Sequence, residues 1–144
     1  MTENARLQAV MDKFEIIETS TVSLCCRDAG DWTRLAQCFH PEARLTTSWF
    51  AGTAREFVEQ SRHMMEGHDP GDTQRHLMGN PRVTIKGHHA VCEYLLILFQ
   101  GRTLDGYEFD FESWAMVLDW HEKRDGVWRI SKRAIIYEKG RMDP

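Results

Sequence analysis

The sequence predicts an α+β fold in which a curved antiparallel sheet wraps around N-terminal helices and encloses an apolar pocket. Helical spacing dominates residues 3–66, and the pattern changes to period two after the loop-like segment GHDPGD at residues 67–72. Helices first and strands afterwards favour this class over one in which the two alternate. Three expected strands of about twelve residues are too long for a small flat sheet. We therefore expect a cone whose mouth can hold a ligand.

The first helix is expected at residues 3–28, where apolar residues recur at three- and four-residue spacing. We expect this stripe to face the core, and it consists of Leu7, Val10, Met11, Phe14, Ile17, Thr21, Leu24 and Cys25. Gly30 provides a stop signal after the helix. Asp31 can cap a second helix at residues 32–39, which Pro41 ends.

A strand is expected at residues 45–50, and Gly52 after it breaks the pattern. Thr53 is expected to cap a third helix that runs to about residue 66. The later strands are expected at residues 74–78, 82–86, 89–100, 108–120 and 127–138. The breaks between them fall at GNP (79–81), GHH (87–89), GRTLDG (101–106) and RDG (124–126), and the last is a good hairpin signal.

The strand at residues 89–100 is apolar on both of its faces. One face can cover helices or a cavity, whereas the other needs a different cover. We expect a partner subunit there, which predicts a homodimer or homotrimer formed through the sheet.

Length and composition restrict the class of protein. A chain of 144 residues fits one domain, which we place at residues 1–144, and no apolar run is long enough to span a bilayer. The net charge of −4 argues against nucleic acid or an anionic membrane as the main partner. The N-terminus lacks the pattern of a secretory signal. The four cysteines form no disulfide framework, so we expect buried, reduced thiols and a cytoplasmic location.

Asp28 is the first candidate for chemistry. At about 100° per residue it lies within roughly 60° of much of the inward stripe of the first helix. It also stands in the last turn, where the helix dipole presents negative charge. Burial and the dipole are both expected to raise the pKa of this carboxyl group and make it a better base near neutral pH. Alternatively, Asp28 simply binds a neighbouring backbone amide at the helix end.

His76 is the second candidate, because it shares a strand face with Gln74 in a pattern that suggests a lined pocket. The alternatives are a structural histidine or an outer sheet face. The other six histidines stand at helix ends, loops or strand ends and are less suggestive: His40, His63, His68, His88, His89 and His121. The sequence contains no HxH or HExxH spacing, so we expect no metal site.

Arg133 lies on the last expected strand. Residues 129, 131, 133, 135 and 137 share one face of this strand, and residues 128, 130, 132, 134 and 136 share the other. An arginine facing a cavity could hold a substrate anion or an oxyanion, or could pair with Asp28. The alternative is a solvated outer face.

Three segments together resemble a known family. The pieces RDAGDWTRLAQCFHPEARL, QRHLMGNPRV and DGVWRISKR, in this order, resemble the SnoaL-like branch of the nuclear transport factor 2-like superfamily, over roughly residues 5–139. The resemblance implies a cystatin-like α+β cone around a pocket. In the dehydratase and dehydrochlorinase members, an Asp at the end of the first helix pairs with a His on a later strand. These positions match Asp28 and His76, and a family arginine matches Arg133.

The sequence differs from one member of the family at Ser23. The bile acid dehydratase has a tyrosine at this position, five residues before the Asp. A phenolic donor would then come from Tyr94, Tyr107 or Tyr137, or be absent. We expect Ser23, Gln74, Trp49, Tyr94 and Tyr137 to contact substrate.

The implied activity is that of a cofactor-independent lyase, a dehydratase or a related elimination enzyme, on a small apolar molecule that is aromatic or alicyclic. His76 would act as general base with Asp28 orienting it, and Arg133 would stabilise negative charge. An isomerase or polyketide cyclase with the same base is the first alternative. A module that binds a small ligand without catalysis is the second.

Overall fold

A computed structural model describes residues 1–143. Three helices and six strands follow one another along the chain, and the strands form one sheet in the order β2-β1-β6-β5-β4-β3. The helices are α1 (Glu3–Ala29), α2 (Trp32–Gln37) and α3 (Ala54–Glu66). The strands are β1 (Phe39–Thr46), β2 (Ala51–Thr53), β3 (Thr73–Lys86), β4 (His89–Leu104), β5 (Tyr107–Arg124) and β6 (Val127–Asp143).

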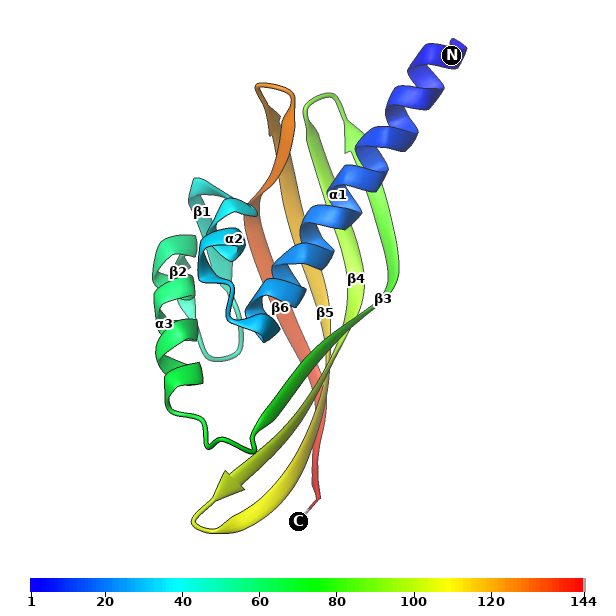
Figure 1. The fold of residues 1–144 in the computed structure, drawn as a ribbon. Coiled ribbons are helices and arrows are strands. Elements are labelled where there is room, and N and C mark those ends of the chain that lie inside the picture. The colour runs from blue at the N-terminus through cyan, green and yellow to red at the C-terminus, as the bar shows by residue number, and fades with distance from the viewer. Residues whose placement is uncertain (144) are drawn as a thin grey trace.

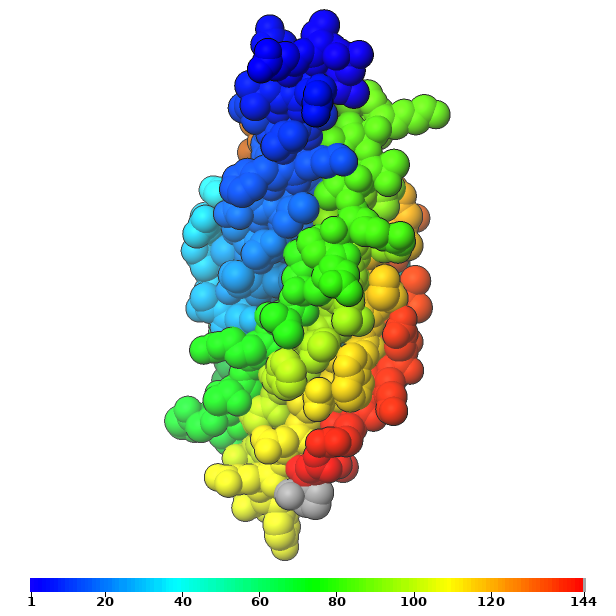
Figure 2. Space-filling view, turned by 90° about the vertical axis from the view of Figure 1, so that its right-hand side faces the viewer, coloured from blue at the N-terminus to red at the C-terminus, as the bar shows by residue number. Residues whose placement is uncertain are grey.

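The predicted α+β class is confirmed, with the helices packed on one face of a strongly curved sheet (Figure 1). Neighbouring strands are antiparallel except β1 and β6, which run parallel, so the sheet is mixed. Helix α1 lies along β3 at one side of the molecule (Figure 2). The curvature leaves room between helices and sheet, and the functional candidates gather in this space.

Helix α1 has the expected length but buries a different face. Thr2 caps its first turn by accepting a hydrogen bond from the Ala5 N–H, and Gly30 ends it with a φ of 72°. Its buried residues are Ile16, Ser20, Ser23, Leu24, Cys26 and Arg27. The expected inward stripe is wrong in the N-terminal half, where Leu7, Val10, Met11 and Phe14 are all exposed. Only the start of α1 extends beyond the sheet (Figure 1). From Asp12 onward the helix contacts β5 and β6 through Asp12 and Glu15, so its apolar stripe faces away from the sheet.

The segment after α2 differs from the expectation. Helix α2 ends at Gln37, and Phe39 already pairs with Ile130 of β6, so Pro41 lies inside β1. Pairing between β1 and β6 is irregular between Phe39 and Arg44, which accommodates a residue without an N–H donor. Gly52 belongs to the short strand β2, which pairs with the end of β1.

Strand β3 is continuous where two strands were expected. The residues between Gly79 and Arg82 form a bulge, with Asn80 at a φ of 50°, so the strand bends without ending. The RDG hairpin is confirmed, because Asp125 and Gly126 both have positive φ, as a tight two-residue turn requires. The turn at Asp105 and Gly106 has the same form and makes β4 and β5 longer than expected.

A bulge in β6 decides which of its side chains face the helices. His121 pairs with Ile130 and Trp120 pairs with Lys132, so Ser131 is the extra residue. Trp128 and Ile130 are buried before the bulge, and Arg133 is buried after it. Strict alternation would have placed Trp128 and Arg133 on opposite faces.

The cysteines are all free thiols, as expected, but only Cys26, Cys38 and Cys92 are buried. Cys25 is exposed, which corrects the expectation for that residue. None of the described helices combines the length and the apolar content that crossing a membrane requires.

Candidate functional site

Asp28 and His76 meet between α1 and β3, although 48 residues separate them in the chain. Asp28 Oδ1 lies 2.5 Å from His76 Nδ1, and Asp28 Oδ2 accepts the backbone N–H of His76 at 2.8 Å. The two side chains are only 9% and 12% exposed, respectively. One carboxylate therefore holds both the ring and the backbone of the histidine, which fixes the orientation of the imidazole.

The hydrogen bonds also determine the ionisation of Asp28 and the tautomer of His76. Burial opposes ionisation of Asp28, but its bonds to His76 and Gln74 and the proximity of the His76 ring outweigh this effect, so its pKa lies below the ordinary value. The expected rise in the pKa of Asp28 is therefore wrong. An ionised carboxylate only accepts hydrogen bonds, so Nδ1 of His76 is the donor. In the neutral imidazole with this tautomer, Nε2 bears the free lone pair.

A cavity of about 250 Å³ lies beside this pair. Its walls come from α1, α3, the segment at residues 47–49 and strands β3 to β6. Among the residues expected to contact substrate or act in catalysis, His76, Arg133, Ser23, Gln74, Trp49 and Tyr137 line it. Asp28 lies behind His76 and is not part of the wall.

Gln74 connects the pair to the neighbouring strand. Its Nε2 donates to Asp28 Oδ1 at 3.3 Å, and its Oε1 accepts from Gln100 of β4 at 3.3 Å. Gln74 therefore supports the carboxylate in addition to lining the cavity.

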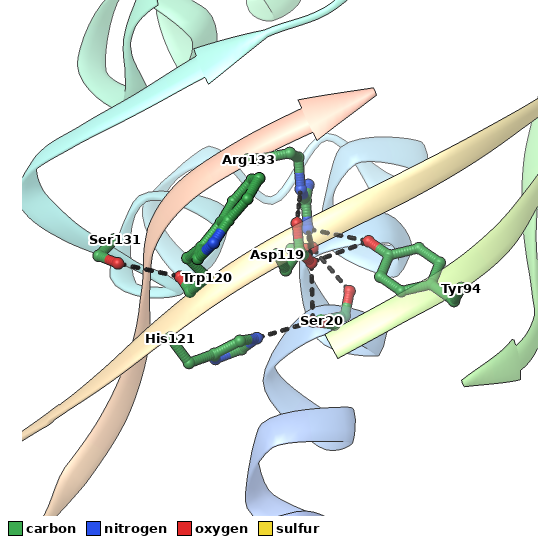
Figure 3. A network of polar contacts seen from close by, with 8 residues as sticks. Ser20, Tyr94, Asp119, Trp120, His121, Ser131 and Arg133 are labelled. Carbon is green, nitrogen blue, oxygen red and sulfur yellow. Dashed lines mark hydrogen bonds and ion pairs between the residues drawn. The ribbon is translucent and has the colours of Figure 1, made fainter. Parts of the chain in front are cut away.

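Arg133 belongs to a buried polar network rather than to the Asp28 pair (Figure 3). Its Nε and Nη2 donate to the two oxygens of Asp119 at 2.6 and 2.8 Å. Nη2 also lies 2.7 Å from Ser23 Oγ and 3.2 Å from the Tyr94 hydroxyl. The suggested pairing of Arg133 with Asp28 and the alternative of a solvated outer face are both wrong, because the bulge at Ser131 turns this side chain inward toward Asp119.

The Arg133–Asp119 pair is ionised in both members. Burial alone would discharge either group, but Arg133 holds the pKa of Asp119 below its usual range and Asp119 holds that of Arg133 above its own. Both side chains are almost fully buried. The guanidinium is thus fixed at the cavity wall, and its Nη1 makes no hydrogen bond to any of residues 1–143.

The network continues to His121, which the sequence had not singled out. Ser20 Oγ donates to Asp119 at 2.8 Å and lies 3.1 Å from His121 Nε2 (Figure 3). His121 Nδ1 is buried and has no hydrogen-bond partner among the described residues. Burial lowers the pKa of His121 to about 4, although the Asp119 carboxylate opposes this. Polar residues at positions 119 and 121 on the buried face of an apolar strand were the signal available in the sequence.

The aromatic candidates separate into two groups. Trp49 and Tyr137 line the cavity and remain partly open to solvent. Tyr94 does not line it: the side chain is 1% exposed, and its hydroxyl donates to Asp119. Tyr107 begins β5 at the β4–β5 turn, does not line the cavity and has 70% of its surface exposed. Tyr137 is therefore the phenol that a cavity ligand can meet.

Arg27 is a second arginine in the cavity wall, and no sequence motif marked it as a site residue. It lies on the buried face of α1, four residues after Ser23 and seven after Ser20. This i, i+3, i+7 spacing of polar residues was its only sequence signal. Within residues 1–143, no cluster of three or more His, Cys, Asp or Glu side chains is arranged to hold a metal ion.

Comparison with solved structures supports the fold. Type 2 of the hexachlorocyclohexane dehydrochlorinase LinA superposes with a TM-score of 0.85 at 15% identity, covering 96% of this chain and 93% of that one. A scytalone dehydratase-like protein from Novosphingobium aromaticivorans gives a TM-score of 0.75 at 14% identity, covering 92% and 88%. At such identities the likeness concerns the fold alone.

Comparison of sequences identifies a curated relative and the family of this chain. Pea pathogenicity protein 2 of Fusarium vanettenii is 28% identical over 121 residues, which is 82% of this chain and 51% of that protein. The chain spans about half the length of the curated relatives it matches. The model of the SnoaL-like domain matches residues 8–134. The chain therefore belongs to the SnoaL-like domain family.

Proposed function

We propose that this protein catalyses a cofactor-independent elimination on a small, largely apolar molecule, aromatic or alicyclic, with His76 as general base. The observation that supports this best is the Asp28–His76 contact of 2.5 Å beside a cavity that His76 lines. Fold neighbours that include a dehydrochlorinase and a dehydratase-like protein also support it.

In this mechanism, Nε2 of His76 removes a proton from a carbon of the substrate. The electron pair of the C–H bond becomes a new double bond, and the leaving group departs from the adjacent carbon with its own bonding pair. Asp28 keeps the ring in the required tautomer and stabilises the imidazolium that forms. General base catalysis supplies about 10²–10⁴-fold, so positioning within the cavity must supply the rest.

Arg133 would stabilise the negative charge that develops on the leaving group or on a substrate oxygen. Asp119 and Ser23 occupy its Nε and Nη2 atoms, which leaves Nη1 for a group in the cavity. A donor that is already fixed before the reaction needs no reorganisation in the transition state. Gln74 would help to hold Asp28.

The test uses purified protein with hexachlorocyclohexane, scytalone and related hydroxylated or halogenated rings, and mass spectrometry detects the loss of water or halide. We expect His76→Gln and Asp28→Asn to lower kcat by about 10²–10⁴-fold. His63→Gln is the control, because His63 lies on α3 with 66% of its side chain exposed. Equal turnover in the dyad variants and the wild type would refute the assignment of the base.

The same experiment separates the two alternatives. A product of unchanged mass, with deuterium from solvent incorporated at carbon, would indicate an isomerase or cyclase that uses the same base. Ligand binding without turnover, unaffected by Asp28→Asn, would indicate a binding module.

We also infer that the protein forms a homodimer or homotrimer through the outer face of its sheet. An apolar patch on β3 to β6 points away from the helices and comprises Leu77, Leu95, Ile97, Phe99, Met116 and Ile136. Burying such a patch against a second copy removes apolar surface from water. Light scattering should show a multiple of 16.8 kDa for the wild type and a smaller mass for Ile97→Lys.

A further inference from the structure

Arg27 presents a buried positive charge that no described residue neutralises directly. The side chain is 7% exposed and lines the cavity that also contains His76. Its Nη1 is fully buried without a hydrogen-bond partner, and its guanidinium takes part in no ion pair within residues 1–143. Its guanidinium carbon lies over the Trp32 ring, 5.9 Å from the ring centroid.

The two buried arginines of the described chain differ in this respect. Arg133 donates hydrogen bonds to Asp119, Ser23 and Tyr94. The Asp28 carboxylate favours the Arg27 charge from a distance, but its oxygens accept hydrogen bonds from His76 and Gln74 and none from Arg27. Arg102 adds a second positive charge in the neighbourhood, and it lies 3.7 Å from its own partner, Asp72.

An unpaired buried guanidinium is unfavourable, because burial removes water from its N–H groups without replacing the hydrogen bonds. Folding alone gives no reason to keep an arginine here, since an apolar side chain would pack without that cost. A ligand that supplies the missing acceptors gives such a reason. The planar, forked guanidinium matches a carboxylate better than any neutral acceptor.

We propose that Arg27 binds a carboxylate of the cavity ligand, so that this protein acts on an ionised carboxylic acid. The claim about the substrate rests on the proposed elimination, whereas the claim about binding does not. The carboxylate would contact Arg27 at the end of α1, and the rest of the ligand would lie along Leu96, Leu98 and Trp49 toward His76. Arg133 stays available for the reacting end.

The first test is calorimetric titration with 2-naphthoate and with 2-naphthamide, which has nearly the same shape but no charge. We expect wild type to bind the carboxylate at least tenfold more tightly, and Arg27→Gln to weaken only the carboxylate, by about 10- to 100-fold. Arg27→Lys should keep part of the affinity. Arg55→Gln is the control, because Arg55 is exposed on α3. Equal binding of both probes, failure of both to bind, or unchanged affinity in Arg27→Gln would overturn the proposal.

A second measurement excludes a purely structural role. If Arg27 is retained for ligand binding, Arg27→Met should have a urea midpoint at or above that of the ligand-free wild type. A lower midpoint would mean that Arg27 supports the fold and would overturn the proposal.

The outcomes also separate this proposal from the elimination itself. Loss of naphthoate binding in Arg27→Gln, together with normal binding in His76→Gln, supports the carboxylate site even if no turnover is found. Elimination that depends on His76 but proceeds on neutral substrates, with Arg27→Gln fully active, refutes the carboxylate site and leaves the base assignment intact.

Discussion

Asp119 and Arg133 stand directly opposite each other on β5 and β6, and their side chains form a two-point ion pair at 2.6 and 2.8 Å inside the core. Such a pair adds little net stability compared with apolar packing, because both charges have lost their water. The pair instead matters because it fixes the positions of the two side chains. The pair fixes a guanidinium at the cavity wall, and it makes the fold dependent on keeping both partners.

Asp119→Asn should therefore be strongly destabilising, because it leaves the Arg133 charge buried and without its counter-ion. We expect a loss of about 3–5 kcal/mol in the free energy of unfolding, measured by urea titration at neutral pH. Arg82→Gln is the control: it breaks the exposed pair of Arg82 with Glu93 and should cost less than about 1 kcal/mol. Similar losses in the two variants would contradict the role assigned to Asp119.

Stability should fall with decreasing pH because of His121. An unfolded histidine takes up a proton below about pH 6.5, whereas in the folded chain its pKa is lowered to about 4. Unfolding between these values takes up a proton, so acid favours the unfolded state by up to about 3 kcal/mol. His121→Gln should show a flatter dependence of unfolding free energy on pH from 6.5 to 4. His63→Gln should behave as wild type, and an unchanged slope in His121→Gln would disprove the assignment.

Any side chain at Gly30 should lower the free energy of unfolding. Its φ of 72° is costly for other residues, and an added Cβ would lie 3.1 Å from Met65 Sδ of α3. Gly30→Ala should lower the free energy of unfolding by about 1–2 kcal/mol or more. Gly71→Ala should have almost no effect, because a Cβ there meets nothing within 4 Å. Thermal unfolding of both variants tests this, and equal melting temperatures would count against it.

One thiol of the four should react quickly with a thiol reagent in the native protein. Cys25 is exposed, whereas Cys26, Cys38 and Cys92 are buried, and burial raises the pKa of Cys38 and Cys92 to about 11. Titration with Ellman's reagent should give one fast equivalent, and the other three should react only after unfolding in urea. Cys25→Ser should remove the fast phase. A fast phase that persists in this variant would show that a buried thiol is accessible.

Local signals in the sequence were sufficient for several elements. The apolar spacing and the Gly30 stop predicted α1 to within a residue of its end, and Thr53 with Glu56 forms the reciprocal cap of α3. The Asp125–Gly126 turn followed from residue preferences alone. Each of these features depends on residues within a few positions of one another.

Features that depend on distant partners were predicted less well. Phe39 joins a strand because Ile130, 91 residues later, offers it a backbone partner, and this overrides the helical pattern before Pro41. The bulges at Asn80 and Ser131 change the phase of two strands, which simple alternation cannot anticipate. The apolar stripe from Leu7 to Phe14 is exposed, because the sheet meets the other side of this helix at Asp12.

The amino-acid sequence by itself determined the α+β class, where the three helices begin, the last hairpin and the identities of Asp28 and His76 as candidates. Only the tertiary structure decided that Asp28 is held ionised, that Arg133 pairs with Asp119 and that no described residue forms a hydrogen bond or ion pair with Arg27. The physical reason is that periodicity records which backbone conformation a segment prefers. The charge state of a buried group depends instead on which donors and acceptors the fold brings within about 3 Å of it from remote parts of the chain.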